Sequence, residues 1–152
     1  MTLTADMRAA VEASVLCWLA TADAQGQPNV SPKEVFAPLG DRIVIAHIAS
    51  PGSVRNIRAN PRVSVAVLDV FAQEGWKFSG TAAILEPGDG GFTPAAAPLE
   101  AITGGAYPIR AVIAIDVSAA DRIVAPSAWL YPDRPPEETR AGVLERYGVR
   151  ET

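Results

Sequence analysis

The chain has 152 residues and a formal net charge of -4, with 13 lysine and arginine residues against 17 aspartate and glutamate residues. This length fits one domain with a sizeable core, and the hydrophobic content of 49% excludes a largely disordered chain. The acidic balance argues against a nucleic-acid partner, for which clustered basic charge is expected. The one cysteine, Cys17, lies in an apolar run, which excludes a disulfide framework and a cysteine-based zinc site.

The sequence gives no sign of a membrane or secretory segment. No apolar run approaches the roughly 20 residues that a membrane-spanning helix needs. The first 14 residues contain Asp6 and Glu12 and lack a hydrophobic core, unlike a signal peptide. We therefore expect a cytoplasmic protein without a membrane partner.

The predicted elements begin with a short helix over residues 4–14, with Thr4 as its N-cap. Strands follow over residues 15–21 and 28–36, joined by a hairpin turn, and a third strand covers residues 42–48. A short helix over residues 53–59 stops at Asn60-Pro61, because a residue that precedes proline disfavours the helical region.

Three more strands are predicted over residues 62–70, 75–85 and 110–117. The Gly-, Pro- and Ala-rich stretch 86–98 predicts a surface excursion. A C-terminal helix is predicted over residues 135–147, with prolines at its start and Gly148 past its end. Six strands joined mostly by hairpins indicate a mainly β protein, a small antiparallel barrel or sandwich, and exclude a Rossmann fold.

Few residues offer catalytic chemistry. The only histidine, His47, ends the third predicted strand and has neither a nucleophile motif nor further metal ligands nearby. It is interpreted as a structural histidine or as one that hydrogen-bonds a ligand, and no metal site is predicted. The segment 50–60 is either an ordinary capped helix or a phosphate site built from Ser50, Ser53, Arg55 and free backbone N–H groups.

The positions of the two lysines are more informative than their number. Lys33 follows Pro32, and a proline within a strand indicates an edge or a bulge that a ligand can approach. Lys77 lies between Trp76 and Phe78. It is either the outward half of a strand alternation or a contact for an anionic ligand bounded by aromatic surface.

Three segments together resemble the pyridoxamine 5′-phosphate oxidase-like family of FMN-binding split barrels. They are residues 26–33 (GQPNVSPK), 50–63 (SPGSVRNIRANPRV) and 77–82 (KFSGTA). The resemblance covers about residues 10–118 and implies a six-stranded antiparallel split barrel. It also implies a homodimer with FMN in clefts between the subunits. Residues 1–152 then form one domain, with residues 119–152 as a C-terminal segment and helix.

The resemblance implies that four segments contact the cofactor. They contribute Asn29, Val30, Ser31 and Lys33; His47 and Ile48; Ser50, Ser53, Val54, Arg55 and Asn56; and Trp76 and Lys77. Lys33 would place a positive charge near the pyrimidine end of the flavin. Trp129 and Tyr131 either cover the cleft or pack the C-terminal segment.

Two departures from the family pattern are visible. The adjacent Arg and Lys of the oxidase fall on Gly52 and Ser53, and the C-terminal Arg-x-His signature is missing. Oxidation of pyridoxamine phosphate is therefore not predicted. The expected function is FMN-dependent two-electron chemistry on an unidentified small molecule. The alternatives are a non-catalytic flavin carrier, or a split barrel that binds the deazaflavin F420 or haem, for which His47 is the one candidate ligand.

Overall fold

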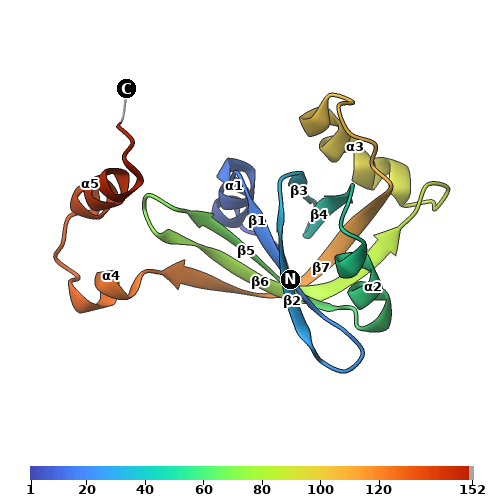
Figure 1. The fold of residues 1–152 in the computed structure, drawn as a ribbon, viewed down its shortest axis with the longest axis horizontal. Coiled ribbons are helices and arrows are strands. Elements are labelled where there is room, and N and C mark those ends of the chain that lie inside the picture. Colours follow the sequence, from blue (N-terminus) through green and yellow to red (C-terminus); the bar gives the residue numbers. More distant parts are fainter. Residues whose placement is uncertain (151–152) are drawn as a thin grey trace.

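The computed structural model describes residues 1–150, which form one curled antiparallel sheet flanked by helices (Figure 1). The sheet has seven strands in the order β2-β1-β5-β6-β7-β4-β3. Its strands are β1 (Cys17–Ala22), β2 (Pro28–Lys33), β3 (Phe36–Leu39), β4 (Arg42–His47), β5 (Arg62–Asp69), β6 (Glu74–Leu85) and β7 (Ala111–Val124). The helices are α1 (Ala5–Ala13), α2 (Pro51–Ala59), α3 (Phe92–Thr103), α4 (Pro126–Leu130) and α5 (Pro136–Tyr147). This is the mainly β split-barrel architecture that the sequence predicts.

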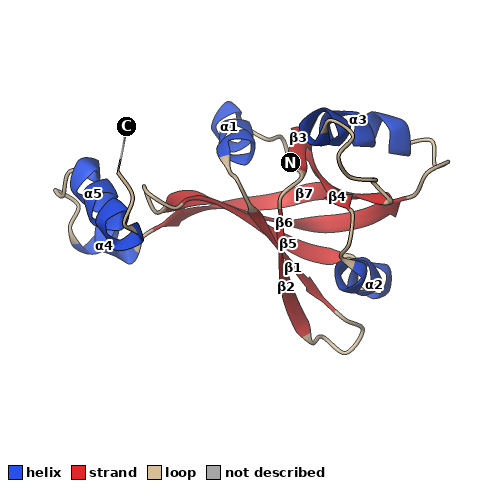
Figure 2. Ribbon diagram, turned by 45° about the horizontal axis from the view of Figure 1, so that its top comes forward, coloured by secondary structure: helices blue, strands red, loops and turns tan. Residues whose placement is uncertain are grey.

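Both faces of the sheet are covered by apolar side chains. Alternation along β5 turns Val63, Val65 and Val67 to one face, where they join residues of α1, α2 and the neighbouring strands. A second cluster on β3, β4 and β7 packs against Leu99 and two alanines of α3. In Figure 2, α1 and α3 lie on either side of β3 and β4, and α2 lies beside the β1–β2 hairpin.

The predicted strand 28–36 is wrong in one respect, because it is two strands. β2 pairs with β1 at one edge of the sheet, whereas β3 pairs with β4 at the opposite edge. The strand is interrupted by a bend at Glu34 and Val35, and the sheet therefore has seven strands where six were predicted. Pro32 lies on the edge strand β2, in the position that its missing N–H favours.

The Gly- and Pro-rich stretch is also corrected. Residues 92–103 form α3 in spite of Pro98, since Ala95, Ala96 and Leu99 are buried against the sheet. Packing there outweighs the helix-breaking tendency of proline. β7 extends to Val124, past the predicted end at residue 117, through a bulge opposite Ser79 and Gly80.

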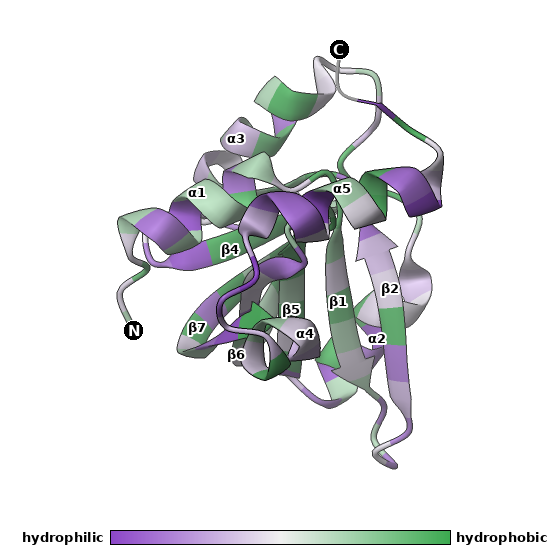
Figure 3. Ribbon diagram, turned by 90° about the vertical axis from the view of Figure 1, so that its left-hand side faces the viewer, coloured by the Kyte–Doolittle hydropathy of each residue, from purple (hydrophilic) through white to green (hydrophobic). Residues whose placement is uncertain are grey.

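The C-terminal helices α4 and α5 project from the end of β7, away from the helices at the other end of the sheet (Figure 1). α5 matches the predicted helix, begins after Pro135 and is capped by Gly148 at a φ of 67°. Hydrophilic residues dominate much of this helix (Figure 3), and Val143 is its one buried residue. None of the helices within residues 1–150 has the length and apolar character needed to cross a membrane.

Candidate functional site

Lys33 is the centre of the candidate site. It ends β2, faces Cys17 of β1 across the strand pair, and is only 5% exposed. Its Nζ donates to Ser31 Oγ at 3.0 Å and to Ser53 Oγ at 3.3 Å. Ser31 lies two residues earlier and therefore on the same face of β2, while Ser53 comes from the first turn of α2. The contacts thus join strand and helix around a buried ammonium group.

This ammonium group has no counter-charge in the part of the chain that the structure describes. No carboxylate of residues 1–150 lies within ion-pair distance of Lys33, and its two hydrogen-bond partners are neutral hydroxyls. Burial lowers the pKa of Lys33. The neighbouring thiol does not compensate, because burial raises the pKa of Cys17 to about 12. A buried cation without an anion is costly, so the site favours an anionic ligand.

The N-terminus of α2 adds hydrogen-bond donors to this region. Ser50 is the N-cap residue but makes no side-chain capping bond, and no acidic residue occupies the first turn. The backbone N–H groups of Gly52 and Ser53 have no hydrogen-bond partner within the helix and point out of its N-terminal end. Asn56 is committed elsewhere, because its Nδ2 donates to Thr21 Oγ1 at 3.0 Å and ties α2 to β1. The first turn is therefore free to hold an anion such as a phosphate.

His47 ends β4 with one ring nitrogen unsatisfied. Its Nδ1 is buried and has no hydrogen-bond partner. Burial lowers the pKa of His47, and the positive charges of Lys33, Arg110 and Arg58 lower it further. The ring is consequently neutral at physiological pH and offers a ligand a hydrogen bond or a lone pair, not a charge.

Residues 46–51 contribute to two cavities that share no lining residue. One, of about 270 Å³, is lined by Lys33, Ala46, Ile48, Ser50 and Tyr107, among others. The other, of about 350 Å³, is lined by His47, Pro51, Val54, Arg55, Arg58 and Arg110, among others. One cavity therefore groups Lys33, Ile48 and Ser50, with Ser31 and Ser53 hydrogen-bonded to Lys33. The other groups His47, Val54 and Arg55.

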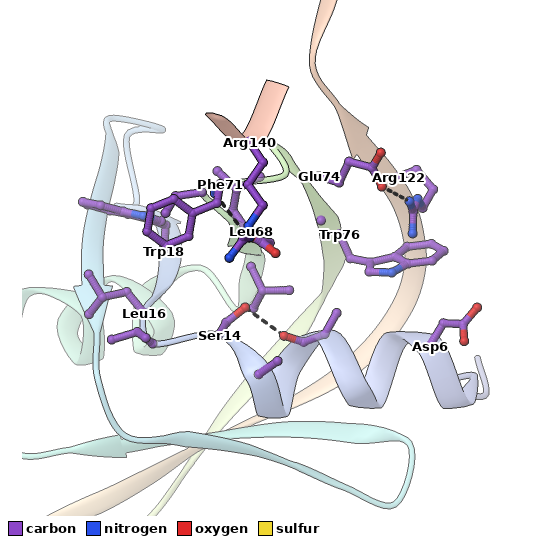
Figure 4. Close-up of a pocket in the computed structure, with 17 residues that line it drawn as sticks. Asp6, Ser14, Leu16, Trp18, Leu68, Phe71, Glu74, Trp76, Arg122 and Arg140 are labelled. Atoms are coloured by element: carbon purple, nitrogen blue, oxygen red, sulfur yellow. Dashed lines mark hydrogen bonds and ion pairs between the residues drawn. The ribbon is translucent and has the colours of Figure 1, made fainter. Parts of the chain in front are cut away.

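The remaining predicted residues lie apart from Lys33 within this chain. Asn29 and Val30 are exposed on the edge strand β2. Lys77 makes an exposed ion pair with Asp121, 3.4 Å from Nζ to Oδ2. Trp76 lines a larger, mostly apolar cavity of about 560 Å³ between α1, β1, the β5–β6 hairpin and α5 (Figure 4). A cofactor contact for Trp76 and Lys77 stays a prediction that requires a second subunit.

Figure 4 shows that this larger cavity has aromatic walls. Trp18 and Phe71 face Trp76 across it, and the guanidinium carbon of Arg122 lies 5.2 Å from the Trp76 ring centroid. Trp129 and Tyr131, by contrast, are exposed on and after α4, at the end of the molecule remote from α2 (Figure 1). They do not cover the Lys33 site of their own chain.

Several residues of the site were not predicted. They are Cys17 at the start of β1, Arg58 in α2, and Tyr107 and Arg110 in the loop before β7. No sequence motif marks any of them. Cys17 reaches the site through strand pairing, and Tyr107 and Arg110 through the α3–β7 connection, so their sequence separation leaves no local signal that finds them. Arg58 lies three residues after Arg55 on α2, where the helical spacing is a signal that could have found it.

Comparison with known proteins places the chain in a family. Residues 3–124 match the pyridoxamine 5′-phosphate oxidase family. Over 80 residues the chain is 36% identical to the haem oxygenase HutZ of Vibrio cholerae, a stretch that covers 45% of this chain and 42% of that protein. The chain therefore matches less than half the length of this curated relative.

Two solved structures have the same fold. HupZ of Group A Streptococcus has a TM-score of 0.66 and 26% identity, over 78% of this chain and 91% of that one. An FMN-binding protein from Syntrophomonas wolfei has a TM-score of 0.67 and 17% identity, over 79% and 85% respectively. Since the family match spans most of the chain and the fold agrees, the chain belongs to the pyridoxamine 5′-phosphate oxidase family.

Proposed function

We propose that the chain binds FMN and acts as an FMN-dependent oxidoreductase on a small molecule. The observation that carries this proposal is the Lys33 ammonium group, which is 5% exposed and hydrogen-bonded only to Ser31 and Ser53. A family whose similar folds include an FMN-binding protein makes a flavin a fitting partner for this unmatched charge.

The residues present fit this cofactor. Lys33 and Ser31 would meet the electron-rich pyrimidine end of the ring, where a fixed positive charge stabilises negative charge. Ser50, Ser53 and the free N–H groups of α2 would hold the phosphate in place of the basic pair that Gly52 and Ser53 replace. Bound FMN supplies two-electron redox chemistry, and the protein supplies position, electrostatics and exclusion of water.

We further propose that the cofactor lies between two copies of the chain. Trp18 and Val30 are 46% and 61% exposed, and the strand register places them on the same face of β1 and β2 as Pro32. Apolar surface of this kind favours a protein partner. In sedimentation experiments we expect twice the chain mass for the wild type and a monomer for Val30→Arg. A wild-type mass of one chain would contradict the dimer.

The test of cofactor binding is an absorbance spectrum followed by an FMN titration. We expect flavin bands in the purified protein, and loss of FMN affinity by at least about 100-fold in a Lys33→Ala/Ser53→Ala double variant, since two polar contacts are removed. Arg42→Ala removes an exposed ion pair with Asp116 and serves as the control with unchanged affinity. Unchanged FMN affinity in the double variant would place the flavin elsewhere.

Haem binding is the second candidate function. It is favoured by the identity shared with the haem oxygenase HutZ and by His47, the only histidine, whose neutral ring lines a cavity. A haemin titration separates the candidates: a haem protein gives a sharpened Soret band that His47→Ala changes. Stoichiometric FMN binding with no specific haemin spectrum rejects this second candidate.

A further inference from the structure

A basic cavity lies outside the proposed flavin site. It has a volume of about 350 Å³ and lies between α2 and the start of β7. Two of its arginines, Arg55 and Arg58, are three residues apart on α2 and so share a helix face. The third, Arg110, is fixed beside the end of β4, because its backbone N–H donates to the His47 carbonyl at 2.9 Å. Three arginines thus line one cavity.

The charges in this cavity are not balanced. Glu86 is the one acidic residue that lines it, and it is paired with Arg58. Across residues 1–150, neither Arg55 nor Arg110 has a carboxylate within ion-pair distance. The net charge of the chain is -4, so this excess of positive charge is local and runs against the overall balance.

Two further features supply donors to the same hollow. The Arg55 guanidinium folds toward the first turn of α2, with Nη2 4.0 Å from the place where a Cβ on Gly52 would lie. His47 buries Nδ1 without a partner, so a ligand in the cavity reaches the ring only through Nε2. In the tautomer with its proton on Nε2, the neutral ring donates a hydrogen bond to a ligand in the cavity.

We propose that this cavity binds a phosphate dianion, either inorganic phosphate or the phosphate group of a small phosphorylated compound. Guanidinium groups match phosphate oxygens with paired hydrogen bonds, and a dianion offsets the two unpaired arginines. The site is distinct from the proposed flavin site, because Lys33 and Ser50 line a different cavity that shares no lining residue with this one. It therefore does not depend on FMN.

The test is a calorimetric titration of the full chain with inorganic phosphate at low ionic strength. We expect saturable binding that Arg110→Ala weakens by about tenfold, since one charge-assisted contact is lost. Glu86→Gln removes the competing carboxylate and is expected to tighten binding by about threefold. Lys33→Met removes a charge that lies outside the cavity lining but still acts on His47, so it should weaken phosphate binding less than Arg110→Ala does.

Arg62→Ala is the matched control, because Arg62 is exposed on β5, has no acidic partner within ion-pair distance in the described chain and does not line the cavity. It should leave phosphate affinity unchanged. Tighter binding of phenyl phosphate than of inorganic phosphate supports a phosphorylated compound as the ligand, and the reverse supports free phosphate. The proposal is overturned if the wild type shows no saturable binding, if Arg62→Ala weakens binding as much as Arg110→Ala, or if Lys33→Met abolishes binding while Arg110→Ala retains it.

Discussion

Replacing Lys33 by methionine separates a ligand-binding role from a structural one. Methionine keeps the length of the side chain but removes its charge and its two hydrogen bonds, to Ser31 and Ser53. A structural lysine and a cofactor-binding lysine predict opposite signs for the change in stability of the ligand-free protein. The same substitution therefore tests both roles.

The expected magnitude follows from the surroundings of the ammonium group. Replacing a buried charge by an apolar side chain of similar volume is often neutral or stabilising by about 1–4 kcal/mol. The buried hydroxyl of Ser53 loses a donor, which costs about 1 kcal/mol. We therefore expect the free energy of unfolding of the ligand-free protein to rise by between about 0 and 3 kcal/mol. FMN affinity should fall by about 10- to 100-fold, because a charge-assisted hydrogen bond is lost.

The pH dependence gives an independent check. Burial holds the pKa of Lys33 below its ordinary value of 10.5, so the unfolded chain binds more protons than the folded one between the lowered pKa and 10.5. Wild-type stability therefore gains from Lys33 as the pH rises through that window. The difference in unfolding free energy between Lys33→Met and the wild type should be largest near neutral pH and shrink as the pH approaches 10.5.

Urea unfolding of both proteins across this pH range, without ligand, measures the stability difference, and flavin fluorescence quenching measures FMN affinity. Lys33→Met with lower stability than the wild type at neutral pH and unchanged FMN affinity would refute the reasoning. Lys33 would then be a structural residue whose hydrogen bonds outweigh its desolvation.

Three other substitutions and treatments test further features. Because the pKa of His47 lies below 6.5, wild-type stability should fall as the pH drops through 6.5, and urea unfolding of His47→Gln should show a weaker loss. With its pKa raised to about 12, Cys17 should react with iodoacetamide at pH of about 8 only in denaturant, as mass spectrometry would show; modification of the native protein would contradict its burial. Gly80→Ala would place a Cβ 2.1 Å from the Asp116 carbonyl oxygen and should lower the unfolding free energy by more than about 2 kcal/mol, while Gly90→Ala, with open space around it, should be nearly neutral.

Much of the local structure follows from short-range patterns. The alternation of Val63, Val65 and Val67 predicts β5, and Asn60-Pro61 predicts the end of α2. Pro32 predicts a sheet edge or a bulge, and β2 is an edge strand. These signals are reliable because period-two burial and the missing proline N–H act within a few residues of the chain.

The α3 helix shows where such patterns fail. Its Gly- and Pro-rich sequence indicates a loop, yet Ala95, Ala96 and Leu99 are buried against β4 and β7. The burial that stabilises this helix comes from strands remote in sequence, so local composition carries no trace of it. The division of residues 28–36 into two strands has the same cause, since each half pairs with a different edge of the sheet.

By itself the sequence determined a mainly β chain of this family and marked Lys33, Ser53 and His47 as the residues to examine. Only the tertiary structure decided that Lys33 is buried without a counter-charge, and that Arg110 joins two arginines of α2 around a second cavity. The physical reason is that charge balance and burial depend on which distant segments meet. Strand pairing and helix packing determine which segments come into contact, and no single segment of the sequence encodes those contacts.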